Sequence, residues 1–151
     1  DGAVHRGGDK GGAGAVIRDH GGAFRAGICH VYHGIVEPEA LEILACKRGL
    51  EVAKEINAHR VHVELDSLGV VQRLQSPHKD HANAEVWIQE IKSILASFSE
   101  FKVSWIRRSA NVVAHKLAKV AVGDDLCKVW LGDTPDCVLD VISDEIPNAF
   151  D

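Results

Sequence analysis

Hydrophobic positions along the chain follow two different periods. Four short apolar or alternating runs have the length and composition of strands, and they cover residues 15–18, 24–33, 61–65 and 101–106. Gly21-Gly22, between the first two runs, is a hairpin signal. Apolar residues at helical spacing predict helices over residues 38–56, 67–74, 85–98 and 111–122.

The order of these elements favours an α/β fold. Strands joined by hairpins come first, followed by a helix, a strand, two helices, a strand and a helix. This order predicts a mixed sheet, antiparallel where hairpins join the strands and parallel where helices intervene, with helices on both faces. The glycine-rich stretch 7–14 lacks the spacing of a phosphate-binding motif, so we expect a permissive loop between strands. We expect one domain over residues 1–122 and a tail, 123–151, that packs back on it and frays from Asp144 onward.

Composition narrows the classes of function. With 151 residues, 46% of them hydrophobic, the chain can bury a core, and no apolar run is long enough to cross a membrane. The net charge of −5 argues against strong non-specific binding to nucleic acid, so a polyanion would need a local basic patch. Because the sequence opens on Asp1, we expect it to be part of a longer protein.

The four cysteines show neither a CxxC pair nor the spacing of zinc ligands. In a domain with a core of this size we expect free, buried thiols in a reducing compartment, and therefore an intracellular protein, nuclear or cytoplasmic. A disulfide or a zinc site is the minor alternative.

Asp66 is the first candidate for chemistry. It follows the apolar run 61–65 and precedes a short helix, and ligands in open α/β sheets bind where parallel strands end. A carboxylate there is placed to hold a metal ion or activate a water. The alternative is that Asp66 only caps the helix that follows.

Glu42 is the second candidate. On the helix 38–56 it lies on the same face as Ala45, Cys46, Gly49, Ala53 and Ile56, opposite the charged face. The helical spacing therefore predicts that Glu42 points toward the sheet, where a buried carboxylate needs a metal, a cation or a hydrogen-bond donor. Glu39 is the other glutamate of this helix that could take this role. It lies closer to the start of the helix, where its negative charge would interact favourably with the helix dipole.

Several segments together resemble the ribonuclease H family. They are Asp1-Gly-Ala-Val, Gly12-Ala-Gly-Ala-Val-Ile-Arg-Asp, Glu42 ahead of Arg48-Gly-Leu, Val63-Glu-Leu-Asp-Ser and Ile106-Arg-Arg-Ser-Ala-Asn-Val-Val-Ala-His. They occur in the family's order from residue 1 to about residue 122, and they are most similar to the plant ribonuclease-H-like domains related to retroelement reverse transcriptases. The resemblance implies a five-stranded mixed sheet, in the order 3-2-1-4-5, flanked by helices.

The resemblance also implies an activity and a site. Family members cleave the RNA strand of RNA–DNA hybrids with carboxylates and two magnesium ions, which activate water and stabilise the leaving oxygen. Carried onto this chain, the metal-binding and catalytic carboxylates are Asp1, Glu42 and Asp66. The fourth catalytic position, an aspartate in the family's Asn-x-x-Ala-Asp pattern, falls on His115.

His115 departs from that pattern. Magnesium accepts nitrogen ligands poorly and manganese somewhat better, so we expect the second ion to be held more weakly and manganese to support cleavage better. A histidine there is also suited to orient a water or to protonate the leaving group. The alternative is a histidine on the helix surface beside Ala118 and Lys119.

A small basic cluster is expected to bind phosphates of the substrate, and it consists of Arg107, Arg108, Lys116 and Lys119. The alternative is that these side chains only face solvent. We expect Asn111 to cap the last helix, with a hydrogen bond to the substrate as a further role. The three tryptophans, Trp87, Trp105 and Trp130, are expected to lie in the core or against the tail and not to stack on bases.

A second hypothesis belongs to a different class. The acidic balance, His115 and the lack of a basic insertion near residues 75–84 fit a catalytically silent module that binds nucleic acid, another protein or the rest of a larger polypeptide. Binding of divalent cations separates the two hypotheses, because an interaction module does not require these ions.

Overall fold

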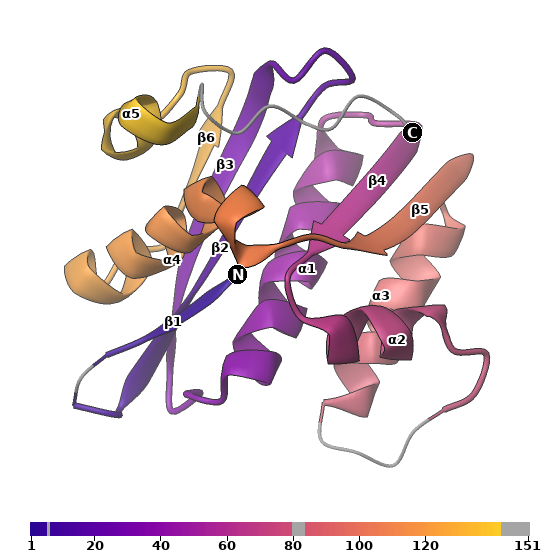
Figure 1. Cartoon of the computed structure of the whole chain (residues 1–151), viewed down its shortest axis with the longest axis horizontal. Coiled ribbons are helices and arrows are strands. Elements are labelled where there is room, and N and C mark those ends of the chain that lie inside the picture. The colour runs from indigo at the N-terminus through magenta and orange to yellow at the C-terminus, as the bar shows by residue number, and fades with distance from the viewer. Residues whose placement is uncertain (6, 80–83, 143–151) are drawn as a thin grey trace.

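The computed structural model describes residues 1–5, 7–79 and 84–142. Two sheets are joined by helices (Figure 1). The strands are β1 Gly2–Val4, β2 Lys10–Arg18, β3 Phe24–His33, β4 Arg60–Leu65, β5 Glu100–Trp105 and β6 Lys128–Leu131. The α-helices are α1 Pro38–Glu55, α2 Leu68–Gln75, α3 Glu85–Ala96, α4 Val112–Asp124 and α5 Leu139–Ile142, and the short 3₁₀ helices are η1 Arg108–Ala110 and η2 Asp136–Val138.

The strands form a four-stranded sheet and a separate two-stranded sheet. The larger sheet is antiparallel with the order β1-β2-β3-β6, and the smaller one pairs β4 with β5 in parallel. The α/β class and the parallel pairing across helices are therefore as expected. The single five-stranded sheet with the order 3-2-1-4-5 is wrong for this structure, because β1 and β4 are not paired.

The position of β1 explains why the two sheets stay separate. Figure 1 shows β4 running toward the centre of the molecule and β1 leading away from it, so β1 starts where β4 stops. β1 has three residues and extends only about 10 Å. It lies alongside β2, where Ala3 is opposite Gly12, and does not run alongside the six residues of β4.

The glycine-rich stretch is mostly strand. Gly11, Gly12 and Gly14 all lie within β2, so the expected loop is wrong beyond residue 9. These glycines let neighbouring elements approach: a Cβ atom on Gly12 would lie 2.2 Å from the Ala118 carbonyl oxygen, and a Cβ atom on Gly11 would lie 2.5 Å from the Ile35 carbonyl oxygen. The absence of side chains thus allows α4 to pack directly against the backbone of β2.

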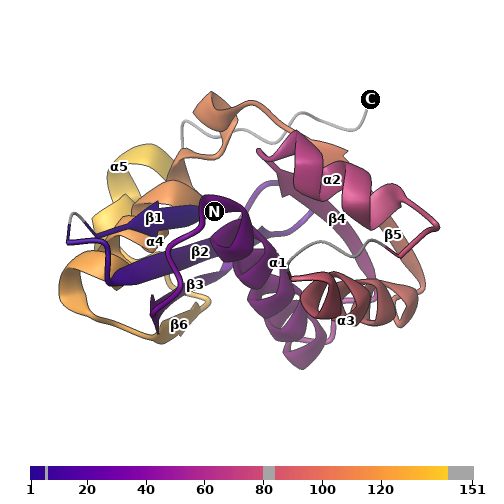
Figure 2. The ribbon, with the colours of Figure 1, turned by 90° about the horizontal axis from the view of Figure 1, so that it is seen from below.

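The core lies on both sides of α1. Figures 1 and 2 show α1 between the two sheets, and it contacts β2 as well as β4 and α3. One cluster joins α1, α2 and α3 to the smaller sheet, and a second joins α4 to β3 and Val138. Pro38 occupies the first turn of α1, where its missing N–H costs nothing. No helix among the described residues has the length and apolarity needed to cross a bilayer.

The segment after α4 returns to the larger sheet. β6 pairs with β3 in antiparallel register, with Trp130 opposite Gly27. Val138 in η2 is fully buried against α4. The expected fraying from Asp144 lies outside the described residues.

All four cysteines are free, as expected, but only two are buried. Cys29 and Cys46 lie in the core, whereas Cys127 and Cys137 are exposed, so the expectation of four buried thiols is wrong for the second pair. Burial raises the pKa of Cys29 to about 11 and that of Cys46 to about 12. Because the thiolate is the reactive form, burial also suppresses the reactivity of these two thiols.

We therefore expect a water-soluble alkylating reagent at pH 8 to modify Cys127 and Cys137 in the folded protein and to spare Cys29 and Cys46. Peptide mass spectrometry would identify the modified positions, and unfolding in denaturant should expose all four. Equal modification of Cys46 and Cys127 in the folded protein would contradict the burial of Cys46 on α1.

Candidate metal centre

Three carboxylates from distant parts of the chain converge at one end of β4. Asp1 precedes β1, Glu42 lies in the second turn of α1 and Asp66 follows β4, yet each offers a carboxylate oxygen within 4.8 Å of the others. Asp1 is 7% exposed, Glu42 is 3% exposed and Asp66 is partly buried. The structure thus brings together the three acidic residues that the sequence singled out.

Strand pairing holds Asp1. Its backbone nitrogen donates a hydrogen bond to the Gly14 carbonyl at 2.7 Å, and the Gly14 N–H donates to the Asp1 carbonyl at 2.8 Å. The Gly2 N–H also donates to Asp1 Oδ1 at 2.7 Å, which fixes one carboxylate oxygen and leaves Oδ2 toward the cluster.

Helix geometry holds Glu42. On its face of α1, Ala45, Cys46 and Ala53 are buried as the helical spacing predicts, whereas Gly49 and Ile56 are partly buried. Glu39 is exposed and forms an ion pair with Arg73 at 3.2 Å, so it is not part of the cluster.

Asp66 does not cap α2. The N-cap of that helix is Ser67, whose Oγ accepts a hydrogen bond from the Val70 N–H at 3.3 Å. The capping alternative for Asp66 is therefore wrong. The carbonyl of Asp66 accepts a hydrogen bond from Trp105 Nε1 at 3.1 Å, so its backbone is held between β5 and the start of α2.

The cluster lacks compensating donors. Asp1 Oδ2, Glu42 Oε1 and Asp66 Oδ2 are buried and have no hydrogen-bond partner among the described residues. The backbone nitrogen of Asp1 approaches Glu42 Oε2 at 3.4 Å, but it serves only one of the three carboxylates. Buried carboxylate oxygens without donors are costly, and a hard divalent cation with oxygen ligands would satisfy them. The donor set therefore fits Mg²⁺ or Mn²⁺.

His115 on α4 lies against this cluster. Its Nδ1 is 2.9 Å from Asp1 Oδ2, without the alignment of a hydrogen bond. Burial lowers the pKa of His115, and the cations Lys119 and Arg108 lower it further, while Asp66 acts in the opposite direction. His115 faces the carboxylates, which argues against the reading as a simple surface residue.

Of the four basic residues expected to contact the substrate, two line a cavity beside the centre and two do not. Arg108, His115 and Lys119 line a cavity of about 580 Å³ between β1 and α4, whereas Arg107 is exposed and does not line it. Lys116 forms an ion pair with Asp140 at 2.8 Å and is directed to the C-terminal segment. Asn111 is buried and occupies the N-cap position of α4, as expected, but its side chain makes no capping hydrogen bond.

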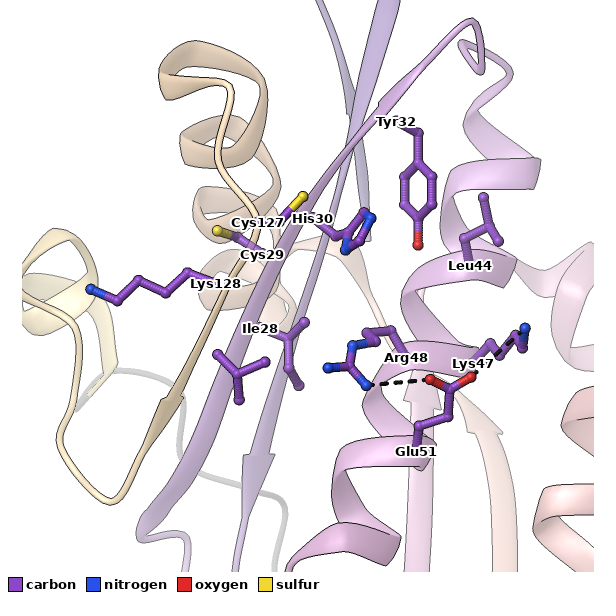
Figure 3. Close-up of a pocket in the computed structure, with 11 residues that line it drawn as sticks. Ile28, Cys29, His30, Tyr32, Leu44, Lys47, Arg48, Glu51, Cys127 and Lys128 are labelled. Atoms are coloured by element: carbon purple, nitrogen blue, oxygen red, sulfur yellow. Dashed lines mark hydrogen bonds and ion pairs between the residues drawn. The ribbon is translucent and has the colours of Figure 1, made fainter.

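A second cavity lies elsewhere. It has a volume of about 510 Å³ and lies between β3, β6 and α1, where His30, Tyr32 and Arg48 line it (Figure 3). None of the residues of the carboxylate cluster lines it. Glu51 forms ion pairs with both Lys47 and Arg48, so these two cations are already neutralised in part.

The tryptophans differ in burial. Trp87 and Trp130 are partly buried against core clusters, as expected, but Trp105 is 47% exposed beside Asp66. The expectation that all three serve packing is wrong for Trp105. Trp105 lies two residues after buried Val103 and therefore on the same face of β5, yet it is exposed at the end of the strand.

Comparison with known proteins agrees with this arrangement. The model of a family described as reverse transcriptase-like matches residues 1–121. A search of curated proteins found no match.

Three solved structures share the fold. Ribonuclease H1 from Halobacterium salinarum is 21% identical with a TM-score of 0.73, covering 83% of this chain and 95% of its own. The N-terminal ribonuclease H domain of a Mycobacterium tuberculosis protein is 21% identical with a TM-score of 0.72, covering 82% and 90%. LC11 ribonuclease H1, solved in complex with an RNA/DNA hybrid, is 21% identical with a TM-score of 0.73, covering 83% and 94%. With the family match over most of its length and these structural neighbours, the chain belongs to the reverse transcriptase-like family and has a ribonuclease H-like fold.

Proposed function

We propose that this protein is a metal-dependent endonuclease that cleaves the RNA strand of RNA–DNA hybrids. The observation that carries the proposal is the convergence of Asp1, Glu42 and Asp66, each with one buried oxygen that accepts no hydrogen bond among the described residues. The structural likeness to a ribonuclease H1 that was solved with an RNA/DNA hybrid supports this class of substrate.

Each side chain has a part in this proposal. Asp1, Glu42 and Asp66 would hold two divalent ions, Mg²⁺ or Mn²⁺, which supply activation of water and stabilisation of the leaving oxygen. His115, against Asp1, would orient a water or transfer a proton through its ring nitrogens.

Phosphates of the substrate would be held by exposed cations. Arg108 and Lys119 line the cavity beside His115, and Arg107 directly precedes Arg108 in the chain. Asn111, at the start of α4 and three residues after Arg108, would add a hydrogen bond to the hybrid. Because the chain carries a net charge of −5, we expect weak binding that falls steeply as salt increases.

The test is a cleavage assay with an end-labelled RNA–DNA hybrid in Mg²⁺, in Mn²⁺ and in excess chelator. We expect RNA fragments with either metal, no fragments with chelator, and no cleavage of single-stranded RNA or duplex DNA under the same conditions. Cleavage that persists in chelator, or equal cleavage of single-stranded RNA, would contradict the proposal.

His115 gives the proposal a sharper form. We expect cleavage to be faster in Mn²⁺ than in Mg²⁺, because manganese accepts a nitrogen ligand more readily. The variant His115→Asp should narrow the difference between the two metals, measured as the ratio of initial rates. Equal rates in the unmodified protein would remove His115 from the metal site.

The presence of a histidine at this position also favours a second candidate, a silent module that binds nucleic acid or protein. Isothermal titration with Mn²⁺ separates the two. The nuclease must bind the ion, and titration heat should vanish in Glu42→Gln but persist in Glu39→Gln, which changes an exposed glutamate on the same helix.

A further inference from the structure

Trp105 is joined to the carboxylate centre by a hydrogen bond to the backbone of Asp66. It is the last residue of β5 and lies opposite Leu65, the residue before Asp66. Its Nε1–H donates a hydrogen bond to the Asp66 carbonyl at 3.1 Å. Trp105 is nevertheless 47% exposed, so a large aromatic residue is partly open to solvent next to Asp66.

The hydrogen bond fixes the direction of the ring. An indole held at its N–H has little freedom to turn inward, so the exposed part presents a surface in a defined orientation beside Asp66. Leu68, two residues after Asp66, is 54% exposed and adds a second apolar side chain close to it in the chain. The exposed surfaces of Trp105 and Leu68 are therefore available to be covered by a ligand.

The residues after Trp105 are of a kind that binds nucleic acid. Arg107 and Arg108 are exposed and lie within three positions of it. An aromatic face beside cations is the combination with which proteins hold sugars and bases next to phosphates. Phe101 lies on the same strand and is 49% exposed, but it is flanked by Glu100 and Lys102 and not by a pair of arginines. It lies about 13 Å along the strand from Trp105.

We propose that Trp105 is a substrate-positioning residue whose ring packs against the nucleotide next to the phosphate held at the carboxylate centre. The inference rests on the proposed function, because it takes the hybrid as the ligand of that centre. The hydrogen bond to Asp66 links the two contacts, so a nucleotide seated on the ring is aligned with the metal ligands.

The test measures binding apart from cleavage. A fluorescently labelled RNA–DNA hybrid is titrated at low salt, with Ca²⁺ in place of the catalytic metals, against the unmodified protein and the variants Trp105→Ala, Trp105→Phe and Phe101→Ala. We expect Trp105→Ala to weaken binding about tenfold, because loss of an aromatic contact to a nucleotide has roughly this effect. Trp105→Phe, which retains a ring, should remain within about threefold, and Phe101→Ala should match the unmodified protein.

Intrinsic fluorescence provides an independent reading. Hybrid binding should quench the tryptophan emission of the unmodified protein, and Trp105→Phe should lose this quenching, since Trp87 and Trp130 are partly buried elsewhere. This comparison applies even if Trp105→Ala does not fold, which thermal melting would reveal.

The outcomes separate the inference from the proposed function. Undiminished binding by folded Trp105→Ala, quenching that survives in Trp105→Phe, or an equal loss in Phe101→Ala overturns the role of Trp105. In each case, cleavage by the unmodified protein would still support the nuclease. If the unmodified protein does not bind the hybrid at all, both the nuclease and the role of Trp105 are excluded.

Discussion

Replacing Asp66 with asparagine is expected to slow cleavage of the hybrid by at least about 10²–10³-fold, the range seen when one preorganised electrostatic contact is removed from a catalytic site. The amide keeps the size of the side chain and its place after β4, but it withdraws one of three negative charges that lie within 4.8 Å. A neutral oxygen is a weaker ligand for a divalent ion, so both metal affinity and rate should fall. The assay is the rate of RNA cleavage in Mg²⁺ and in Mn²⁺.

The same substitution should act on stability in the opposite direction. Without metal, the crowded carboxylates of Asp1, Glu42 and Asp66 repel one another, so removing one charge should raise the melting temperature of the metal-free protein. The unmodified protein should gain stability when Mn²⁺ is added, and Asp66→Asn should gain much less.

Glu64→Gln is the matched control, because Glu64 lies two residues earlier on the same strand and is exposed. It should retain both the rate of cleavage and the stabilisation by metal. A folded Asp66→Asn variant that still cleaves the hybrid at the original rate would remove Asp66 from the mechanism.

The direction of Glu42 could be predicted from sequence because it depends on local geometry. α1 is an uninterrupted helix of 18 residues, and a regular helix fixes which side chains share a face. The position of Asp66 at a strand end could also be predicted from a local pattern, the apolar run 61–65 before it. The proximity of His115 to Asp1 was implied only by the resemblance to a family, since no local pattern relates residues so far apart in the chain.

Two features could not be predicted from the sequence: the division of the strands into two sheets, and the strand conformation of the glycines in β2. Both depend on contacts with residues that are distant in the chain. Gly11, Gly12 and Gly14 have low strand propensity. They are strand because neighbouring strands pair with β2 and because α4 lies over Gly12 and Gly14. Whether β1 pairs with β4 depends on where each strand starts and ends, and the apolar pattern does not encode that.

Gly14→Ala is expected to be the most destabilising conservative substitution near the centre. A Cβ atom at Gly14 would lie 2.1 Å from the Ala114 carbonyl oxygen and 2.4 Å from the Ala118 backbone nitrogen, so α4 must move away from β2. Displacing backbone atoms of this kind costs about 3 kcal/mol. For a domain of this size that corresponds to a fall of about 10 °C in the melting temperature, measured by circular dichroism.

The shift would also reach the metal centre. Gly14 exchanges both backbone hydrogen bonds with Asp1, and Ala114 precedes His115, so moving α4 from β2 separates His115 from Asp1. We therefore expect the folded fraction of Gly14→Ala to bind Mn²⁺ more weakly by isothermal titration. Gly123→Ala on the same helix is the control: no heavy atom lies within 4 Å of its added Cβ, so it should be neutral or stabilise by up to about 1 kcal/mol. If Gly14→Ala were as stable as Gly123→Ala, α4 would not lie against β2 as closely as the structure places it, and the contact between His115 and Asp1 would lose its support.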